Sequence, residues 1–164
     1  MTSTFISLIF PSLLIAAAYK DITSFTIPNR IVTVMVATWP FAFLYTGLPM
    51  AEGGMTLLMA VVVLALGFGL FATNTLGAGD VKLLAAATLW VGSEHILWFL
   101  IYTTVMGGGL ALFLLTFRKL PLPAFAFSQR WLVDLHARER VMPYGVAIAV
   151  GGILSWSQSG VFTP

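Results

Sequence analysis

Two aspartates stand at the edges of apolar segments, where they could act together as an acid and a base. Asp21 ends the first apolar run, and Asp80 directly precedes another, residues 81–91. An ionisable side chain at the mouth of a membrane segment is costly to keep there, which makes it a functional candidate. Two carboxylates that share a water molecule hydrolyse a peptide bond when one deprotonates the water and the other protonates the carbonyl oxygen. We therefore expect a pair that holds one proton between its members.

The remaining residue types exclude most other catalytic chemistry. The sequence has no cysteine, which excludes a thiolate nucleophile, a disulfide framework and a cysteine-type zinc site. It has no G-x-S-x-G, P-loop or G-x-G-x-x-G pattern. The two histidines, His95 and His136, fall on opposite membrane faces in the topology derived below, so they cannot share a metal. We predict no metal, no cofactor and no nucleic-acid partner.

The composition is that of a protein embedded in lipid. Hydrophobic residues make up 59% of the 164 residues and charged residues 9%, and the mean hydropathy is +0.98. These values predict an all-α, polytopic membrane protein with a single transmembrane domain, residues 1–164. The first charge, Lys20, follows the first apolar run, so we expect a retained helix rather than a signal peptide. The six apolar segments are residues 4–19, 31–47, 55–73, 81–91, 96–117 and 142–156.

The basic residues predict how these segments cross the membrane. All eight Lys and Arg fall in the first, third and fifth connections between segments. The positive-inside rule therefore places these three connections in the cytoplasm and both termini outside. Asp21 and Asp80 then lie on the same, cytoplasmic side. That shared side is derived from charge alone.

The depth of Asp80 follows from the length of its segment. A helix from Asp80 to Val91 is about 18 Å long, whereas the hydrocarbon core of a bilayer is about 30 Å thick. Asp80 is therefore expected below the cytoplasmic surface, unless this helix is instead recessed at its outer end. Non-helical backbone at that depth needs protein or water around it, so we expect a wet cleft around residues 73–80.

The fifth connection, residues 118–141, is predicted to be a cytoplasmic loop with an amphipathic stretch. Such a stretch suits the interface plane of a membrane. Either it is a basic loop that holds the topology, or it docks substrate. The residues expected to share one helical face are Phe127, Trp131 and Leu135, with Arg130, Asp134 and Arg138 elsewhere.

The predicted helix ends suggest how the two acids divide their roles. Asp80 begins a helix, where free N–H groups favour an anion, and Asp21 ends one, where the field is opposite. We therefore assign more base character to Asp80 and more acid character to Asp21. Lys20 and Lys82 complicate this assignment, because a neighbouring cation would keep either carboxylate ionised.

The glycines before Asp80 have two interpretations. Gly77 and Gly79 permit positive φ and allow an extended peptide to approach the backbone beside the acid. The alternative is an ordinary turn in which Asp80 caps a helix and Asp21 is an interfacial charge. The shared side and the calculated depth favour a functional pair.

Three motifs in order make the chain similar to the bacterial prepilin peptidases, also called type IV leader peptidases, of the GxGD class of intramembrane aspartic proteases. The resemblance covers nearly the whole chain, and the order and spacing of the motifs make it specific. The motifs are Asp21 through Ile27-Pro28-Asn29, Gly77-Ala78-Gly79-Asp80-Val81-Lys82, and Pro143-Tyr144-Gly145 with Ala147-Ile148.

The resemblance implies that Asp21 and Asp80 are the catalytic aspartates. It implies supporting or substrate-binding roles for the other motif residues: Pro28, Asn29, Gly77, Gly79, Lys82, Pro143, Tyr144 and Gly145. The implied substrate is a prepilin or pseudopilin with a short basic leader. Cleavage would take place at the cytoplasmic face of the bacterial inner membrane, just after a glycine that precedes the substrate's hydrophobic segment.

One departure separates this chain from the larger members of that family. Those members carry a cysteine-rich cytoplasmic insertion and also N-methylate the new pilin terminus. This chain has no cysteine and only a ten-residue first connection, residues 20–29. It resembles the short, peptidase-only members associated with Flp or tight-adherence pili, so we expect no methyl transfer.

Two other functions are compatible with paired acids in a membrane protein. In a small ion-coupled transporter, Asp21 and Asp80 would bind ions or protons, and the isolated protein would leave prepilins intact. In a non-catalytic subunit of a pilus assembly machine, changing either aspartate would leave pilin processing unaltered.

Overall fold

The chain folds into helices, as its composition predicts. The computed structural model describes residues 2–122, 124–137 and 142–159, and within these ranges it contains no strand. The all-α prediction is therefore confirmed. The helices are α1 (Thr2–Ser24), α2 (Asn29–Thr46), α3 (Met50–Ala72), α4 (Ala78–Val91), α5 (Ile96–Phe117), α6 (Arg130–Ala137) and α7 (Tyr144–Ser159), with short 3-10 turns η1 (Ser93–His95) and η2 (Ala124–Ser128).

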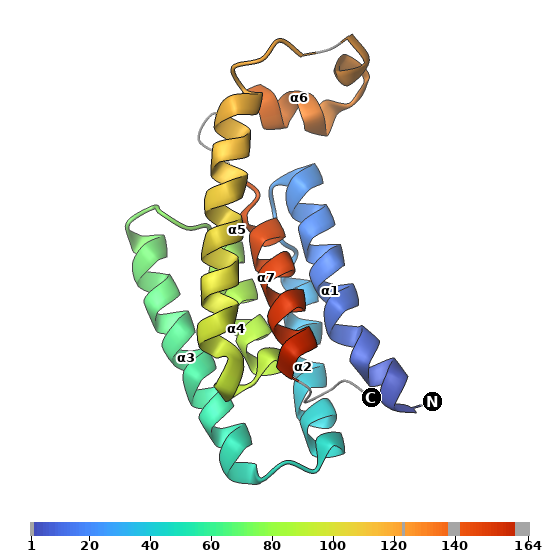
Figure 1. Cartoon of the computed structure of the whole chain (residues 1–164), viewed down its shortest axis with the longest axis vertical. Helices are drawn as coiled ribbons and strands as arrows, with labels where there is room; N and C mark the ends of the chain where they lie inside the picture. The colour runs from blue at the N-terminus through green and yellow to red at the C-terminus, as the bar shows by residue number, and fades with distance from the viewer. Residues whose placement is uncertain (1, 123, 138–141, 160–164) are drawn as a thin grey trace.

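The six apolar segments of the sequence correspond to α1–α5 and α7, which run up and down one bundle (Figure 1). The connections that follow α1, α3 and α5 lie at one end, which we call the aspartate end. The α2–α3 and α4–α5 connections lie at the opposite end, where α1 begins and α7 ends (Figure 1). The predicted alternation of the connections is thus present in the fold.

The long and short helices alternate along the chain. Three candidate membrane spans, Ile6–Ser24, Met50–Ala72 and Ser93–Phe117, are long and apolar enough to cross a membrane. The helices that return from them are shorter: α2 has 18 residues, α4 has 14 and α7 has 16. At 1.5 Å per residue, α4 is about 21 Å long. The number of helices that cross a membrane and the location of the termini outside the cell remain predictions.

Helix α4 is the centre of the bundle. It packs against α2, α3 and α7, and nearly all of its residues after Lys82 are buried. A helix that is apolar on every side is expected in such a position. Two contacts of Trp90 fasten it: the indole N–H donates to the Met35 carbonyl oxygen at 2.9 Å, and the ring stacks on Phe10.

The start of α4 is recessed relative to the end of α3. A Cβ added to Gly67 would lie 2.8 Å from Val81, so the first turns of α4 meet α3 at Gly67. Helix α3 continues for five further residues, to Ala72. Asp80, which directly precedes Val81, therefore lies below the end of α3.

The amphipathic stretch of the fifth connection is shorter than predicted. Figure 1 shows α6 lying crosswise over the aspartate end of the bundle. Leu135 is buried beneath it, and its carbonyl oxygen accepts a hydrogen bond from Arg118 Nε at 3.1 Å. The expectation that Phe127 shares this helical face is wrong, because Phe127 lies in η2 before the helix begins and is 66% exposed. Arg138 lies outside the described residues.

Labelling of single cysteines tests which end of the bundle faces the cytoplasm. Because the chain has no cysteine, each variant carries one reactive thiol. We expect Ser24→Cys and Gln129→Cys, at the aspartate end, to resist a membrane-impermeant maleimide in intact cells, whereas Glu52→Cys reacts. All three residues are exposed, so burial does not mask the result. The reverse pattern would place the aspartate end outside.

Candidate active site

Asp21 and Asp80 line the same cavity at the aspartate end of the bundle. The cavity has a volume of about 380 Å³. Its walls come from the end of α1, the end of α3, the α3–α4 connection, the start of α4 and the start of α7. The structure therefore brings together the two acids that the sequence singled out. The lining residues are Asp21, Phe25, Phe71, Asn74, Thr75, Leu76, Gly77, Asp80, Met142 and Tyr144.

Asp21 is held in place by a second helix. Its side chain is 5% exposed, and its Oδ2 accepts a hydrogen bond from the Gly145 N–H at 2.7 Å. Gly145 is in the first turn of α7, where backbone N–H groups have no partner within the helix and favour a negative charge. The sequence-based assignment of acid character to Asp21 considered only the field of α1. The C-terminus of α1 disfavours a negative charge on Asp21, whereas the N-terminus of α7 favours it. The contact with α7 therefore removes the basis for that assignment.

Asp80 is the third residue of α4 and not its cap. The N-cap is Gly77, which has an extended backbone with φ −72° and ψ 147°. The alternative in which Asp80 caps the helix is therefore wrong. The Asp80 carboxyl group faces the backbone amides of Gly77 and Gly145. Its Oδ1 atom is buried and has no hydrogen-bond partner among the described residues, which is unusual for a buried carboxyl oxygen and marks a candidate reactive group.

The glycines of this region make room for neighbouring groups. Neither Gly77 nor Gly79 adopts the positive φ that glycine permits, since the described glycines with positive φ are Gly47 and Gly92. A Cβ on Gly77 would lie 2.8 Å from Asp80 Oδ2, and one on Gly79 would lie 3.3 Å from Ile27 Cβ. Gly77 therefore leaves space for the carboxylate, and Gly79 leaves space for Ile27.

Ile27 fills the space between the starts of α4 and α7. It is 9% exposed. It contacts Gly79 on one side, and a Cβ added to Gly145 would lie 3.0 Å from Ile27 Cδ1. The same added Cβ would lie 2.8 Å from Asp21 Oδ2. The segment that follows α1 therefore separates the start of α4 from the start of α7.

Pro28, Asn29 and Lys82 lie beside the site and outside its cavity. Pro28 is the N-cap of α2, and the Asn29 Oδ1 atom accepts a hydrogen bond from Lys82 Nζ at 3.2 Å. This bond connects α2 to α4. Neither Lys82 nor Lys20 is among the residues that line the cavity of the acids.

The third motif supplies one wall of the cavity. Tyr144 lines it, and its ring lies directly against Gly107 of α5. Pro143, which precedes Tyr144, is fully buried. With Gly145 bonded to Asp21, the start of α7 contributes both a wall and a hydrogen-bond donor.

Sequence reasoning missed several residues of the cavity. Asn74 has φ 56° and ends α3 in a Schellman motif, in which Thr75 N–H donates to the Leu70 carbonyl oxygen at 3.0 Å. An asparagine just after an apolar run is a usable signal for such an end. Phe25, with φ 52°, and Phe71 carry no comparable signal, because aromatic residues are common throughout this apolar chain.

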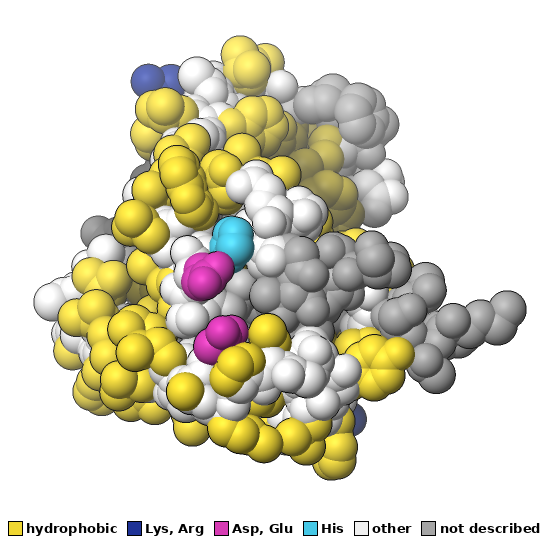
Figure 2. Space-filling view, turned by 60° about the horizontal axis from the view of Figure 1, so that its bottom comes forward, with side chains coloured by type: hydrophobic (Ala, Val, Ile, Leu, Met, Phe, Trp, Pro, Cys, Tyr) yellow, Lys and Arg dark blue, Asp and Glu magenta, His cyan; other side chains and the backbone are white. Residues whose placement is uncertain are grey.

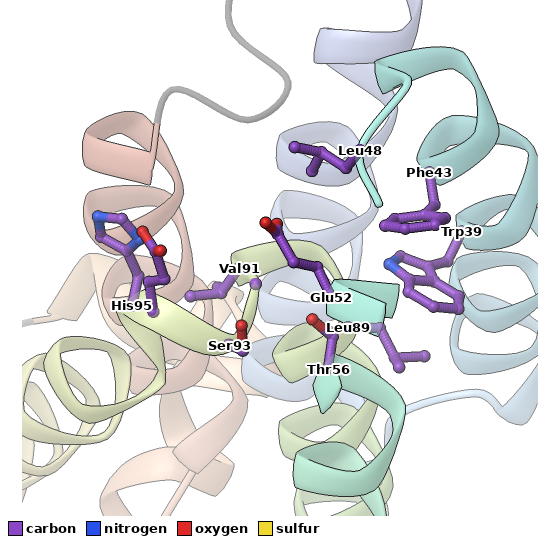
Figure 3. Close-up of a pocket in the computed structure, with 11 residues that line it drawn as sticks. Trp39, Phe43, Leu48, Glu52, Thr56, Leu89, Val91, Ser93 and His95 are labelled. Atoms are coloured by element: carbon purple, nitrogen blue, oxygen red, sulfur yellow. The ribbon is translucent and has the colours of Figure 1, made fainter. Parts of the chain in front are cut away.

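A second cavity, of about 210 Å³, lies at the opposite end of the bundle. Figure 2 shows acidic and histidine side chains gathered on this end face among hydrophobic ones. In Figure 3, Glu52 points into the cavity, with His95 at its far side. The described residues contain no group of three or more metal-ligating side chains, here or elsewhere. The lining residues are Trp39, Phe43, Leu48, Glu52, Thr56, Leu89, Val91, Gly92, Ser93, Glu94 and His95.

His95 and His136 lie at opposite ends of the bundle, as predicted. His95 ends η1 beside the second cavity. His136 belongs to α6, where its ring meets the edge of the Phe117 ring. Among the described residues, no histidine lines the cavity of the acids, and the ionisable side chains that do are Asp21, Asp80 and Tyr144.

Substitution of Gly145 tests the packing around Asp21. The methyl group of Gly145→Ala would overlap Asp21 Oδ2 and Ile27, and overpacking of this kind costs about 1–3 kcal/mol of stability. We expect a lower melting temperature in detergent. The matched control is Gly108→Ala in α5, where an added Cβ meets nothing within 4 Å and helix propensity favours alanine. Equal melting temperatures for the two variants would contradict the described packing.

Comparison with known proteins identifies the family of the chain. No curated protein and no solved structure shows significant similarity to the chain. The model of the type IV leader peptidase family matches residues 8–112, a range that contains both Asp21 and Asp80. Because this match covers more than half of the chain, the protein belongs to the type IV leader peptidase family.

Proposed function

We propose that the protein is a membrane-embedded aspartic endopeptidase that removes short basic leaders from prepilins or pseudopilins. Membership of a leader peptidase family supports a protease that acts on prepilin-type substrates. The observation that carries the aspartic mechanism is the single cavity that Asp21 and Asp80 line together. This cavity contains no serine, cysteine or histidine among its lining residues.

In the proposed mechanism, the two carboxyl groups act as one unit that holds one proton. Both groups are at least partly buried, and two neighbouring carboxylates in such a place do not readily ionise together. The ionised member takes a proton from water, which attacks the scissile carbonyl carbon. The protonated member gives its proton to the carbonyl oxygen, and the pair later protonates the leaving amine. The Gly145 N–H holds one oxygen of Asp21 throughout.

The cavity suits an extended peptide beside the acids. Its polar groups come from the acids, Asn74 and Thr75, and its apolar walls come from residues on α3 and α7 and from the connections between helices. A scissile peptide has to be extended to be hydrolysed, because the backbone groups of a helix are already paired. We propose Gly77, Gly79, Tyr144 and Gly145 as residues that shape this site around the substrate.

The distribution of charge supports a cytoplasmic active site in the inner membrane. The described Lys and Arg residues belong to the aspartate end: Lys20, Arg30, Lys82, Arg118, Lys119 and Arg130. Glu52 and Glu94 line the cavity at the opposite end. By the positive-inside rule, the aspartate end faces the cytoplasm and both termini lie outside. Residues 118–141 then form a cytoplasmic loop of one transmembrane peptidase domain.

Removal of the acids one at a time tests the proposed mechanism. We expect purified wild-type protein in detergent or liposomes to cleave a prepilin, and Asp21→Asn and Asp80→Asn to lose at least about 10²-fold in rate, because each variant removes one titrating group. Asparagine keeps the shape of the side chain. The matched control, Glu52→Gln, removes a carboxylate at the opposite end and should retain wild-type activity. The readout is the rate of leader removal on a gel or by mass spectrometry.

Normal cleavage by either folded aspartate variant would contradict the paired mechanism. It would favour a non-catalytic role in pilus assembly if pilin processing in cells were also unchanged. An intact prepilin with the wild-type protein, together with aspartate-dependent ion flux in vesicles, would favour a transporter.

The second proposed property is that the protein transfers no methyl group. The first connection of the described structure is only the short segment between Ser24 and Asn29, and the chain has no cysteine. We expect no label on processed pilin after incubation with the protein and radiolabelled S-adenosylmethionine. The leader must be cleaved in the same reaction, so that an inactive preparation is recognised. Incorporation of label would overturn this prediction.

A further inference from the structure

Helix α3 packs on α4 through a regular seam. The seam residues are buried and alternate in spacing between three and four residues, which keeps them on one side of a helix. Small side chains dominate the seam, so the two helices approach closely. The seam consists of Thr56, Ala60, Val63 and Gly67, whereas Gly53, the buried residue before them, lies against Phe43 of α2.

The seam continues beyond the start of α4. Leu70 and Phe71 follow Gly67 by three and four residues and therefore lie on the same side of α3. They are 47% and 40% exposed, although the seam residues before them are buried. Helix α4 meets α3 at Gly67 through Val81, and only residues 78–80 of α4 precede that contact. Every residue from 68 to 75 is exposed.

This uncovered end of the seam adjoins the cavity of the acids. Phe71 and Asn74 both line that cavity. Phe68 lies next to Phe71, with ring centroids 5.9 Å apart. We call Phe68, Leu70 and Phe71 the α3 overhang. The overhang is an exposed apolar part of α3 that begins at the rim of the cavity, beyond the contact of Gly67 with Val81.

We propose that the α3 overhang docks the apolar helical segment of the substrate that follows the scissile bond. This inference rests on the proposed function and adds the surface by which the substrate is held. An extended residue spans about 3.3 Å, so a helix that starts a few residues after the scissile bond begins at the rim of the cavity. The first apolar surface of α3 that it meets there is the overhang, which extends the α3–α4 seam.

An apolar groove on the other side of α4 does not adjoin the acids in the way that the docking of this substrate segment requires. The groove is lined by residues of α2, α3 and α4 that include Lys82, Ala86 and Leu89. Lys82 follows Asp80 by two residues, which places it about 200° around the helix. A substrate helix in that groove would be separated from the acids by α4 itself.

Two substrates and two matched variants test the proposal. The long substrate has a basic leader and an apolar segment of about 20 residues, and the short substrate keeps the leader and only the first residues of the segment. For Leu70→Ala we expect kcat/KM on the long substrate to fall about fivefold through KM, since buried apolar contact is lost. The fall on the short substrate should be smaller. Leu58→Ala, on the opposite face of α3 and 54% exposed, is the control.

The outcomes separate the inference from the function on which it rests. If wild-type protein cleaves neither substrate, the proposed function fails. If wild-type protein cleaves the long substrate and Leu70→Ala behaves as Leu58→Ala does, the function stands and the docking surface is wrong.

Photocrosslinking in an inactive protein provides a measurement that does not depend on cleavage. In the Asp80→Asn background, Phe68 is replaced by benzoylphenylalanine, and the control carries the same replacement at Phe113 of α5. These phenylalanines are 64% and 59% exposed, and both belong to the halves of their helices near the aspartate end. We expect the long substrate to crosslink to position 68 and not to position 113. Equal crosslinking at the two positions, or crosslinking at position 68 to lipid or to a second copy alone, would overturn the proposal.

Discussion

The hydrogen bond between Asp21 and Gly145 is the interaction on which the site depends. It is buried, it measures 2.7 Å, and it joins the last turn of α1 to the first turn of α7. A buried carboxylate that lost this donor would be left with an unmet desolvation cost. The bond requires glycine at position 145, because a Cβ there would overlap the Asp21 carboxylate. Ile27, packed between Gly79 and Gly145, sets the distance to α4.

The short length of α4 turns this junction into a cavity. A central helix as long as α3 would fill the space above Val81 with its own side chains. Because α4 starts at Ala78 and meets α3 at Gly67, the end of α3 stands above it. Asp80 is therefore placed inside the bundle and still lines a cavity with Asn74 and Thr75. Beyond the same contact, Leu70 and Phe71 are 47% and 40% exposed.

Much of this arrangement follows from the sequence. The contacts between residues that are far apart in the chain do not. Apolar runs and breaks predicted the helices within a few residues, and the positions of Lys and Arg predicted which connections share an end. The charge pattern also predicted that Asp21 and Asp80 lie together. It gave no sign that Gly145, far along the chain, donates to Asp21. It also gave no sign that Gly79 leaves space for Ile27, which lies in another connection.

The two acids differ in what holds them, and this difference bears on how they share a proton. Asp21 has a short, fixed hydrogen bond to a helix N-terminus, which stabilises a negative charge at Oδ2. Asp80 also faces helix N-terminal amides, but its Oδ1 is buried without a partner among the described residues. A protonated Oδ1 could donate to a substrate carbonyl, whereas an ionised one would carry an unsatisfied charge in a buried place. On these grounds, we propose Asp80 as the proton donor in the resting pair and Asp21 as the base, which reverses the assignment from the helix ends alone.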